Sequence, residues 1–265
     1  MRSLPEDNLA YPVLVVLDSG GMGTACVINC PEANYLATAK HVLFDSNNNL
    51  RAKSAVLKSY TPKLIESDFT QVTLDLNVAM QNGNIQFHDT HDVCLVRMFS
   101  KSYPNEMGPG VVINVISSKG IAGVNIDTTF KYLDEVMLSN DVYIFGYPAS
   151  IGLRNSPQFN SEMPLLRKGT VAGKNNTNKT IILDCPVYQG NSGGPVIEVE
   201  AVPNLGGIAF KLIGIVSQFV PAEEHWRNMS FGITNVQWSN SGYSVVEPTD
   251  FIKELIEKFK PIKQA

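Results

Sequence analysis

The chain has 265 residues, of which 44% are hydrophobic and 17% are charged, and its formal net charge is −4. This length can build one large all-β domain or two smaller lobes around a sizeable core. With an isoelectric point of about 5.6, the chain has no basic footprint for nucleic acid, so we expect no nucleic-acid partner.

The N-terminal residues do not predict a leader or an anchor. The first eight residues carry acids and a proline where a signal peptide needs an apolar run. Residues 13–17 are apolar but too few to span a bilayer. We therefore expect a soluble, cytoplasmic protein without a membrane partner.

Four cysteines, Cys26, Cys30, Cys94 and Cys185, occur without a C-x-x-C pair or a dense Cys/His cluster. Cys26 and Cys30 come closest to a metal-binding pair, but free buried thiols in a reducing compartment explain the pattern better. We predict four unbridged thiols and no metal site.

Short apolar runs between turn residues predict a chain made mainly of strands. The expected strands of the first half are residues 11–18, 23–28, 35–39, 55–60, 71–76, 78–81 and 93–98. Extra strands at 111–116, 120–126 and 129–133 surround a predicted crossing between two lobes. Later strands are expected at 141–147, 167–173, 180–185, 196–202, 212–219 and 231–234.

A C-terminal helix is predicted to open at Thr249-Asp250. Its residues Ile252, Leu255, Ile256 and Phe259 are spaced by three and four positions, so they form one apolar stripe. Such a stripe predicts that the helix docks on the second lobe.

A serine stands between glycines in the string Gly190-Asn191-Ser192-Gly193-Gly194-Pro195. Glycine permits positive φ and lets a ligand approach the main chain, as a nucleophilic serine and its oxyanion donors require. A glycine-rich hairpin is the alternative reading of such a pattern. This string resembles the nucleophile loop of chymotrypsin-fold (trypsin-like) serine proteases, and is closest to their bacterial Deg-type members.

The same family carries its catalytic histidine in a Thr-Ala-x-His string, which Thr38-Ala39-Lys40-His41 resembles. Three other histidines compete for the role, and none follows such a string: His88, His91 and His225. Asp92 precedes an apolar strand, as the triad aspartate of the family does, whereas the rival Asp89 does not. The order His41, Asp92, Ser192 is that of the chymotrypsin triad.

The resemblance implies an all-β fold of two Greek-key β-barrels with a C-terminal helix. It places His41 and Asp92 in an N-terminal lobe of residues 1–105, and a connection at residues 106–140. A C-terminal lobe of residues 141–265 carries Ser192, and the parts together make one protease domain.

The resemblance also implies the roles of the site residues. His41, Asp92 and Ser192 would be catalytic, and the Gly190 and Ser192 N–H groups would form the oxyanion hole. The substrate-binding residues would be Pro186, Ser217, Phe219 and Gly232. No cofactor or metal is needed.

The resemblance further implies a preference for the residue before the scissile bond. Uncharged Pro186 would form the pocket floor, Phe219 would narrow the entrance, and Gly232 would leave the far wall open. We therefore expect a small or medium uncharged residue, with aliphatic types ahead of large aromatics. Ser217 would support the triad aspartate.

Two departures from the secreted members bear on activation. Val42 follows His41 where those members have a bridging cysteine, and Asn191 stands where an aspartate pairs with a new N-terminus. Activation by N-terminal insertion is therefore not expected. The loop would be competent as made, or it would be ordered by a regulatory protein partner, and the sequence leaves both open.

The function that these residues predict is a serine endopeptidase acting on protein or peptide substrates. The alternative is a catalytically silent protease fold that serves as a binding or regulatory module. A silent module has no physical need for His41, Asp92 and Ser192 together, so we favour the enzyme.

Overall fold

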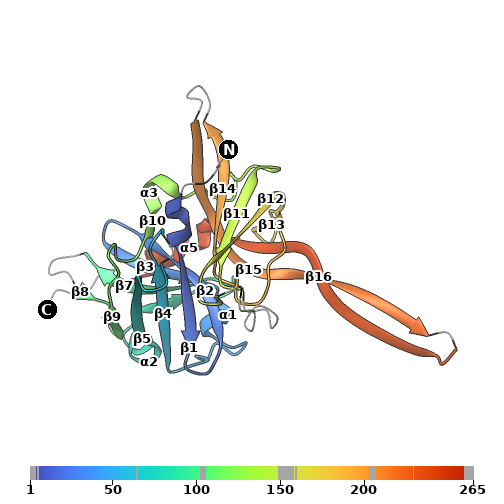
Figure 1. Cartoon of the computed structure of the whole chain (residues 1–265), viewed down its shortest axis with the longest axis horizontal. Coiled ribbons are helices and arrows are strands. Elements are labelled where there is room, and N and C mark those ends of the chain that lie inside the picture. The colour runs from blue at the N-terminus through green and yellow to red at the C-terminus, as the bar shows by residue number, and fades with distance from the viewer. Residues whose placement is uncertain are drawn as a thin grey trace.

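The computed structural model describes residues 4, 6–63, 65–101, 106–148, 158, 160–202, 207–228 and 230–259. Two β-sheets lie side by side, and a long two-stranded arm extends away from the second sheet (Figure 1). Most of the described chain is in strands, as the sequence predicted.

In the described part of the chain, the first sheet has ten strands. Eight of them follow one path in the order β6-β7-β3-β2-β1-β4-β5-β9, while β10 pairs with β2 and β8 pairs with β7. These strands are β1 (Pro12–Leu17), β2 (Met22–Asn29), β3 (Ala33–Thr38), β4 (Ser54–Tyr60), β5 (Phe69–Asp75), β6 (Ile85–Phe87), β7 (Cys94–Ser100), β8 (Glu106–Met107), β9 (Val111–Val115) and β10 (Gly123–Asn125).

The second sheet is a closed barrel in the order β11-β12-β13-β16-β15-β14. Its strands are β11 (Asp141–Gly146), β12 (Leu165–Asn175), β13 (Thr180–Asp184), β14 (Pro195–Val202), β15 (Gly207–Asn228) and β16 (Ile233–Pro248). The all-β fold class with two barrel-like sheets is thus confirmed. Where the lobes divide, at residues 105 and 140, stays a prediction.

Helices are short except at the C-terminus. They are η1 (Glu6–Ala10), α1 (Lys40–Leu43), α2 (Leu76–Gln81), α3 (Ile126–Thr129) and α5 (Thr249–Lys258). Helix α5 buries Phe251, Ile252 and Leu255, so the predicted apolar stripe is confirmed. The helix docks against strands of both sheets, β6 and β7 as well as β15 and β16, and not on the second lobe alone. None of the helices in the described ranges has the length and apolar character needed to cross a membrane.

Two predicted strands are wrong. Residues 78–81 belong to helix α2, because the Asp75 side chain caps it by accepting the Val78 N–H and because Leu76 and Ala79 bury one helical face. Residues 129–133 form no strand; Thr129 ends α3, and only Phe130 makes an isolated bridge, to Leu212.

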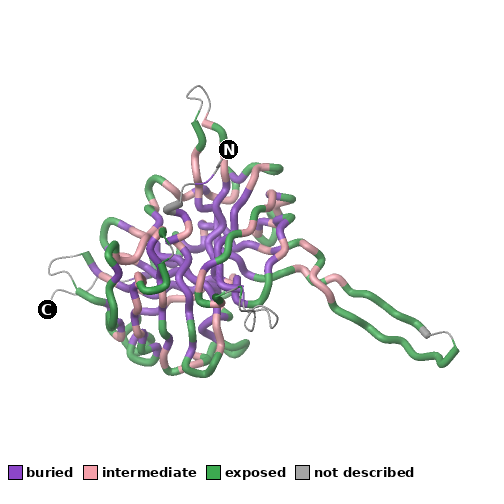
Figure 2. Tube along the Cα trace, viewed as in Figure 1, coloured by how far each residue is buried: buried purple, intermediate pink, exposed green. Residues whose placement is uncertain are grey.

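The buried hydrophobic residues of the core come from both sheets, and the arm lies outside this core (Figure 2). All four cysteines are buried and unbridged, as predicted. Burial raises the pKa of Cys26 and Cys30 to about 12, so both thiols stay protonated near neutral pH. They pack as small apolar side chains and not as reactive groups.

The arm is made of the distal parts of β15 and β16, which run together well beyond the barrel (Figure 1). The pairing continues from Pro221 opposite Asn240 to Asn228 opposite Ile233. Residues 231–234 were predicted to form a wall of the specificity pocket. They lie instead at the far end of this arm, because the chain between Phe219 and Ser244 forms a hairpin extension and does not return directly to the barrel.

Candidate active site

Three residues that the sequence predicted to act together line one cleft, of about 870 Å³. His41 comes from α1, Asp92 from the turn before β7, and Ser192 from the loop between β13 and β14. The first sheet therefore supplies two of these side chains and the barrel supplies the third. The structure brings all three together although they are far apart in the sequence.

His41 stands on the single turn of α1, directly after β3. Val42 and Leu43 are buried, so this short helix is fixed against the core while the His41 side chain stays 47% exposed to the cleft. Its Nδ1 lies 2.7 Å from Asp92 Oδ2, and its backbone N–H donates to Asp92 Oδ1 at 2.9 Å. One carboxylate thus sets both the position and the ring orientation of the histidine.

Asp92 receives a further hydrogen bond from the Ser217 hydroxyl, at 2.7 Å. Burial alone would raise the pKa of Asp92, but the hydrogen bonds and charge of His41, with the Ser217 hydroxyl, outweigh burial and lower the pKa below its usual 3.8. The carboxylate is therefore ionised at neutral pH. An ionised acceptor at this place favours the proton on Nδ1 and leaves Nε2 as the basic nitrogen.

Ser192 is held by both sheets through its own backbone and that of its neighbour. Its carbonyl accepts the Thr24 N–H from β2 at 2.8 Å, and the Gly193 N–H donates to Val216 of β15 at 2.7 Å. Gly193 has φ +82, and a Cβ there would lie 2.1 Å from the Thr24 carbonyl oxygen. Only glycine fits this position, because the loop is pressed against β2.

The Ser192 hydroxyl donates to the Ser217 carbonyl at 3.2 Å and, within the described chain, not to His41. In enzymes without bound substrate, catalytic hydrogen bonds are often long or poorly aligned, and they tighten only when substrate is bound. Rotation about the Cα–Cβ bond of Ser192 moves its Oγ without moving the loop. The resting hydroxyl is thus in the cleft, beside β15.

The loop before Ser192 leaves two N–H groups free. Gly190 takes φ +96, and its carbonyl is turned away to accept the Thr24 hydroxyl at 2.6 Å. Among the described residues, neither the Gly190 nor the Ser192 N–H has a hydrogen-bond acceptor. Two unpaired donors beside a serine are the arrangement that an oxyanion needs.

Asn191 holds the same loop together through hydrogen bonds within the loop. Its side chain is buried, with Oδ1 accepting the Tyr188 N–H at 3.1 Å, while its own N–H donates to the Tyr188 carbonyl at 2.9 Å. Gly194 in turn donates to the Asn191 carbonyl. The loop is therefore braced by residues of the loop itself.

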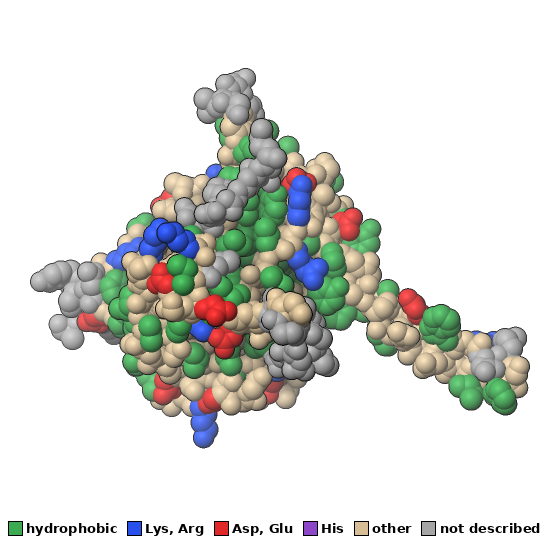
Figure 3. Space-filling model, in the orientation of Figure 1, with side chains coloured by type: hydrophobic (Ala, Val, Ile, Leu, Met, Phe, Trp, Pro, Cys, Tyr) green, Lys and Arg blue, Asp and Glu red, His purple; other side chains and the backbone are tan. Residues whose placement is uncertain are grey.

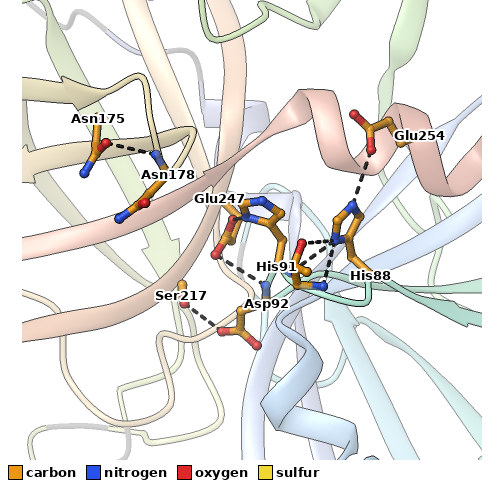
Figure 4. Close-up of polar contacts among 9 residues, drawn as sticks. His88, His91, Asp92, Asn175, Asn178, Ser217, Glu247 and Glu254 are labelled. Carbon is orange, nitrogen blue, oxygen red and sulfur yellow. Dashed lines mark hydrogen bonds and ion pairs between the residues drawn. The ribbon is translucent and has the colours of Figure 1, made fainter.

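A second layer of ionisable groups lies behind Asp92 (Figure 4). Glu247 of β16 accepts the Asp92 N–H at 3.3 Å and meets His91 Nδ1 at 3.0 Å. The His91 ring stacks on Phe251 of α5, with centroids 3.6 Å apart. Burial raises the pKa of Glu247. This layer links the turn that carries Asp92 to the barrel and to the C-terminal helix.

The sequence did not identify Glu247. The sequence feature that could have identified Glu247 is its place as a single acid in the apolar run Val245-Val246-Glu247-Pro248. An acid within such a strand is buried only where it has hydrogen-bonding or charged partners. His91 was weighed only as a rival to His41. It lies instead behind the carboxylate.

Of the four predicted substrate-binding residues, Ser217 and Phe219 line the cleft. Pro186 does not, although the next two residues, Val187 and Tyr188, do. Gly232 is not brought to the cleft either, since it lies in the turn at the end of the arm with φ +63. The other residues that line the cleft are Thr90, Asn175, Asn178, Thr180, Ile182, Gln189, Gln218, Val245 and Glu247.

Within the part of the chain that the structure describes, no three His, Cys, Asp or Glu side chains are grouped to hold a metal ion. A histidine oriented by a carboxylate, a serine and two free N–H groups together fit acyl transfer.

This fold and site define the class of chymotrypsin-fold serine proteases. The sequence between residues 23 and 202 matches the trypsin-like peptidase domain family, and the chain belongs to that family. The chain therefore carries a trypsin-like peptidase domain. A comparison with curated proteins finds no match.

Solved structures with a similar fold are distant in sequence. Human heparin binding protein is 11% identical, with a TM-score of 0.56, and the alignment covers 99% of this chain and 98% of that one. A variant of the HtrA-type protease AlgW with a bound tripeptide is 14% identical, with a TM-score of 0.50. That alignment covers 94% of this chain, which spans only 59% of the AlgW chain. At these identities the likeness shows the fold.

Proposed function

We propose that the protein is a serine endopeptidase that works through His41, Asp92 and Ser192. Ser192 Oγ attacks the scissile carbonyl while His41 Nε2 takes its proton. The acyl-enzyme forms as His41 returns that proton to the leaving amine, and water then releases the acyl group by the same steps. The observation that carries the proposal is the 2.7 Å contact between His41 and Asp92 in the cleft that also holds Ser192.

The Gly190 and Ser192 N–H groups would bind the oxyanion of each tetrahedral intermediate. Losing one such donor costs about 3–4 kcal/mol in comparable sites. The free state of both donors supports this role. Asp92 would keep the His41 ring in the productive tautomer and stabilise the imidazolium that forms.

We further propose that the site needs no N-terminal insertion to become active. The Asn191 side chain, where the secreted relatives have an aspartate, is satisfied by Tyr188 within its own loop. A new N-terminal amine would therefore find no unpaired carboxylate at this place. Four buried, unbridged cysteines support a reducing, intracellular setting.

The substrate would be a protein or peptide with an uncharged residue before the scissile bond. The cleft walls around that position are uncharged, including Val187, Tyr188, Gln218 and Phe219. Asp184, the nearest acid in sequence before this loop, is exposed on β13 and is not part of the cleft. A cationic side chain would thus find no counter-charge there.

The experiment that tests this function is hydrolysis of β-casein by the wild-type chain and by Ser192→Ala. We expect wild type to cleave casein and Ser192→Ala to lose about six orders of magnitude in turnover, as in comparable triads. Equal cleavage by both proteins would contradict the proposal. The control Ser118→Ala removes a hydroxyl outside the cleft and should cleave as wild type does.

A further inference from the structure

The arm is an unusual feature, because it continues the strand that borders the cleft. Residues Ser217, Gln218 and Phe219 of β15 line the cleft. The same strand then continues to Asn228. A peptide that lies along β15 in the cleft would therefore reach the arm if it were extended far enough.

One edge of this strand is free over the whole distance. β14 pairs with β15 only from Val202 to Pro195, so its last partner on β15 is Ile215. From Ser217 onward the described residues place no strand on that side of β15. The unpaired edge that begins in the cleft is the same edge that follows the arm.

A free edge on a two-stranded ribbon is a binding surface for a third strand. Isolated ribbons of two strands are only marginally stable in water, and a third strand supplies both hydrogen bonds and side-chain contacts. Pro221 lacks an N–H and interrupts this edge once, so the useful stretch begins at Ala222. It ends with Asn228, the last residue of β15.

The free edge carries one large apolar side chain, Trp226, among charged and polar ones. Trp226 on β15 is 61% exposed, and Ile233, 62% exposed, lies near it on the same face, since residues opposite each other in register share a face. Trp238, 63% exposed, lies on the other face, opposite Glu223. Figure 3 shows hydrophobic side chains gathered toward the end of the arm.

An added strand would cover Trp226 on one face of the arm, while Trp238 lies on the other face, on β16. Consecutive side chains of a strand point to opposite faces, so an added strand places its residues beside Trp226 on one face and toward Trp238 on the other. The charged side chains of the free edge are of both signs, Glu223 and Glu224 with Arg227, and Glu223 lies 2.9 Å from His225, so the edge does not favour a ligand of one charge.

The base of the arm is tied to the cleft. The Asn240 side chain donates to the Val187 carbonyl at 2.6 Å, and Ser241 donates to the Val220 carbonyl at 2.6 Å. Val187 belongs to the cleft wall just before the nucleophile loop. The arm is therefore held in a defined direction where it leaves the barrel.

We propose that the arm is an extended substrate-binding strand. In this assignment, which rests on the proposed function, an unfolded, largely apolar segment of the substrate adds to the free edge of residues 222–228. That segment lies several residues before the scissile bond, beyond the residues held in the cleft. The substrate class is thus an extended or unfolded polypeptide with an apolar stretch upstream of its cleavage site, and not a short peptide.

The test uses a property of the sequence: the chain has two tryptophans, and both are on the arm. The probe is oxidised insulin B chain, a tryptophan-free, largely apolar peptide, added to the Ser192→Ala chain so that it is bound but not cut. We expect the tryptophan emission to shift to the blue and quenching by acrylamide to fall, since a third strand covers Trp226.

A second chain carries a shortened arm, with residues 223–238 replaced by Asn-Gly. The turn joins Ala222 to Ser239, which already face each other in register. We expect the fluorescein-labelled B chain to bind this protein at least about tenfold more weakly, a change of roughly 1.4 kcal/mol. Trp226→Ala should also weaken binding, while the control Ile116→Ala, which changes an exposed apolar residue just after β9, should not.

The outcomes separate the arm from the catalytic site. With Ser192 present, the shortened chain should react with a fluorophosphonate at the wild-type rate, which reports the site independently of the arm. Equal B-chain affinity with and without the arm, no B-chain binding by the full chain, or binding without a change in tryptophan emission would overturn the proposal. So would a blue shift without peptide, either with rising protein concentration and a dimer in sedimentation or on adding phosphatidylcholine vesicles.

Discussion

Strands β15 and β16 pass through two contrasting surroundings. Inside the barrel, Leu212, Ile213 and Ile215 are fully buried, and Ser217 is fixed against Asp92. Beyond Phe219 the same two strands leave the core, and Trp226 and Trp238 are mostly exposed. One pair of strands thus has a buried part, which positions Ser217 beside Asp92, and an exposed part with unpaired strand edges and exposed apolar side chains.

The difference teaches that strand pairing alone does not indicate what a strand contributes. In the barrel, pairing is combined with burial, so each side chain adds to stability. In the arm the strands are paired but their side chains are not buried. Side-chain contacts can therefore stabilise the arm only when a partner covers it. We therefore expect substitutions in the barrel part to change turnover or folding, and substitutions in the arm to change only the use of long substrates.

The largest effect should come from the carboxylate beside the barrel part. Asp92→Asn should lower turnover by about four orders of magnitude, because the amide no longer holds the productive His41 tautomer. Asp89→Asn, only three positions away but exposed and outside the His41 contact, is the matched control and should stay near wild type. Steady-state kinetics with a short peptide measure both, and the reverse pattern would refute the assignment.

The next prediction compares how substitutions in the barrel part and in the arm change the free energy of unfolding. Ile213→Ala should lower the free energy of unfolding by about 2–5 kcal/mol, since it empties a fully buried site in the barrel. Trp226→Ala removes a larger side chain but should stay within about 0.5 kcal/mol, because that side chain is exposed. Urea unfolding compares them. A large loss at Trp226 would show that the arm is packed in the free protein.

Much of the site was predictable, because its strings are local. Each of Thr38–His41 and Gly190–Pro195 specifies one turn whose backbone is set by adjacent residues, so no long-range information was needed. The arm was not predictable in this way. A strand of the arm and a strand of the pocket wall show similar side-chain alternation, so residues 231–234 matched the wall although Val245 lies there.

The same reason explains the two wrong strands and the missed acid. Residues 78–81 were predicted to be a strand, but the Asp75 cap and the burial of Leu76 and Ala79 make residues 76–81 a helix. Glu247 needed its partners His91 and Asp92, which are more than 150 residues away in sequence. Such contacts are set by tertiary packing and leave only a weak local signal.

A smaller effect concerns the hydroxyl that the barrel part contributes to the triad. Ser217→Ala removes a hydrogen bond to an ionised carboxylate, worth about 1.5–3 kcal/mol. The pKa of Asp92 is lowered in the folded state, so its contribution to stability is present above the usual 3.8 and is lost as pH falls through the folded pKa.

The stability difference between wild type and Ser217→Ala should therefore be largest above about pH 4 and shrink on further acidification. Unfolding in urea over a series of pH values measures it. A difference that stays constant down to the acid end would show that the hydroxyl does not act through the charge of Asp92.

The smallest effect we expect is on the choice of residue before the scissile bond. The cleft offers Val187, Tyr188, Gln218 and Phe219, and its two acids, Asp92 and Glu247, already contact His41 and His91. Aliphatic residues should therefore be preferred over arginine or lysine by about tenfold or more in kcat/KM. A peptide library profiled by mass spectrometry measures the preference. Dominant cleavage after arginine or lysine would contradict it and would implicate Asp184.

The most direct test of the central claim is to map where a fluorophosphonate reacts. We predict a single adduct on Ser192 in the wild-type chain, a much slower reaction in His41→Ala and in Asp92→Asn, and an unchanged rate in the chain with the shortened arm. An adduct on another residue, or an equal rate in wild type and His41→Ala, would contradict the claim that His41, Asp92 and Ser192 act as one catalytic unit.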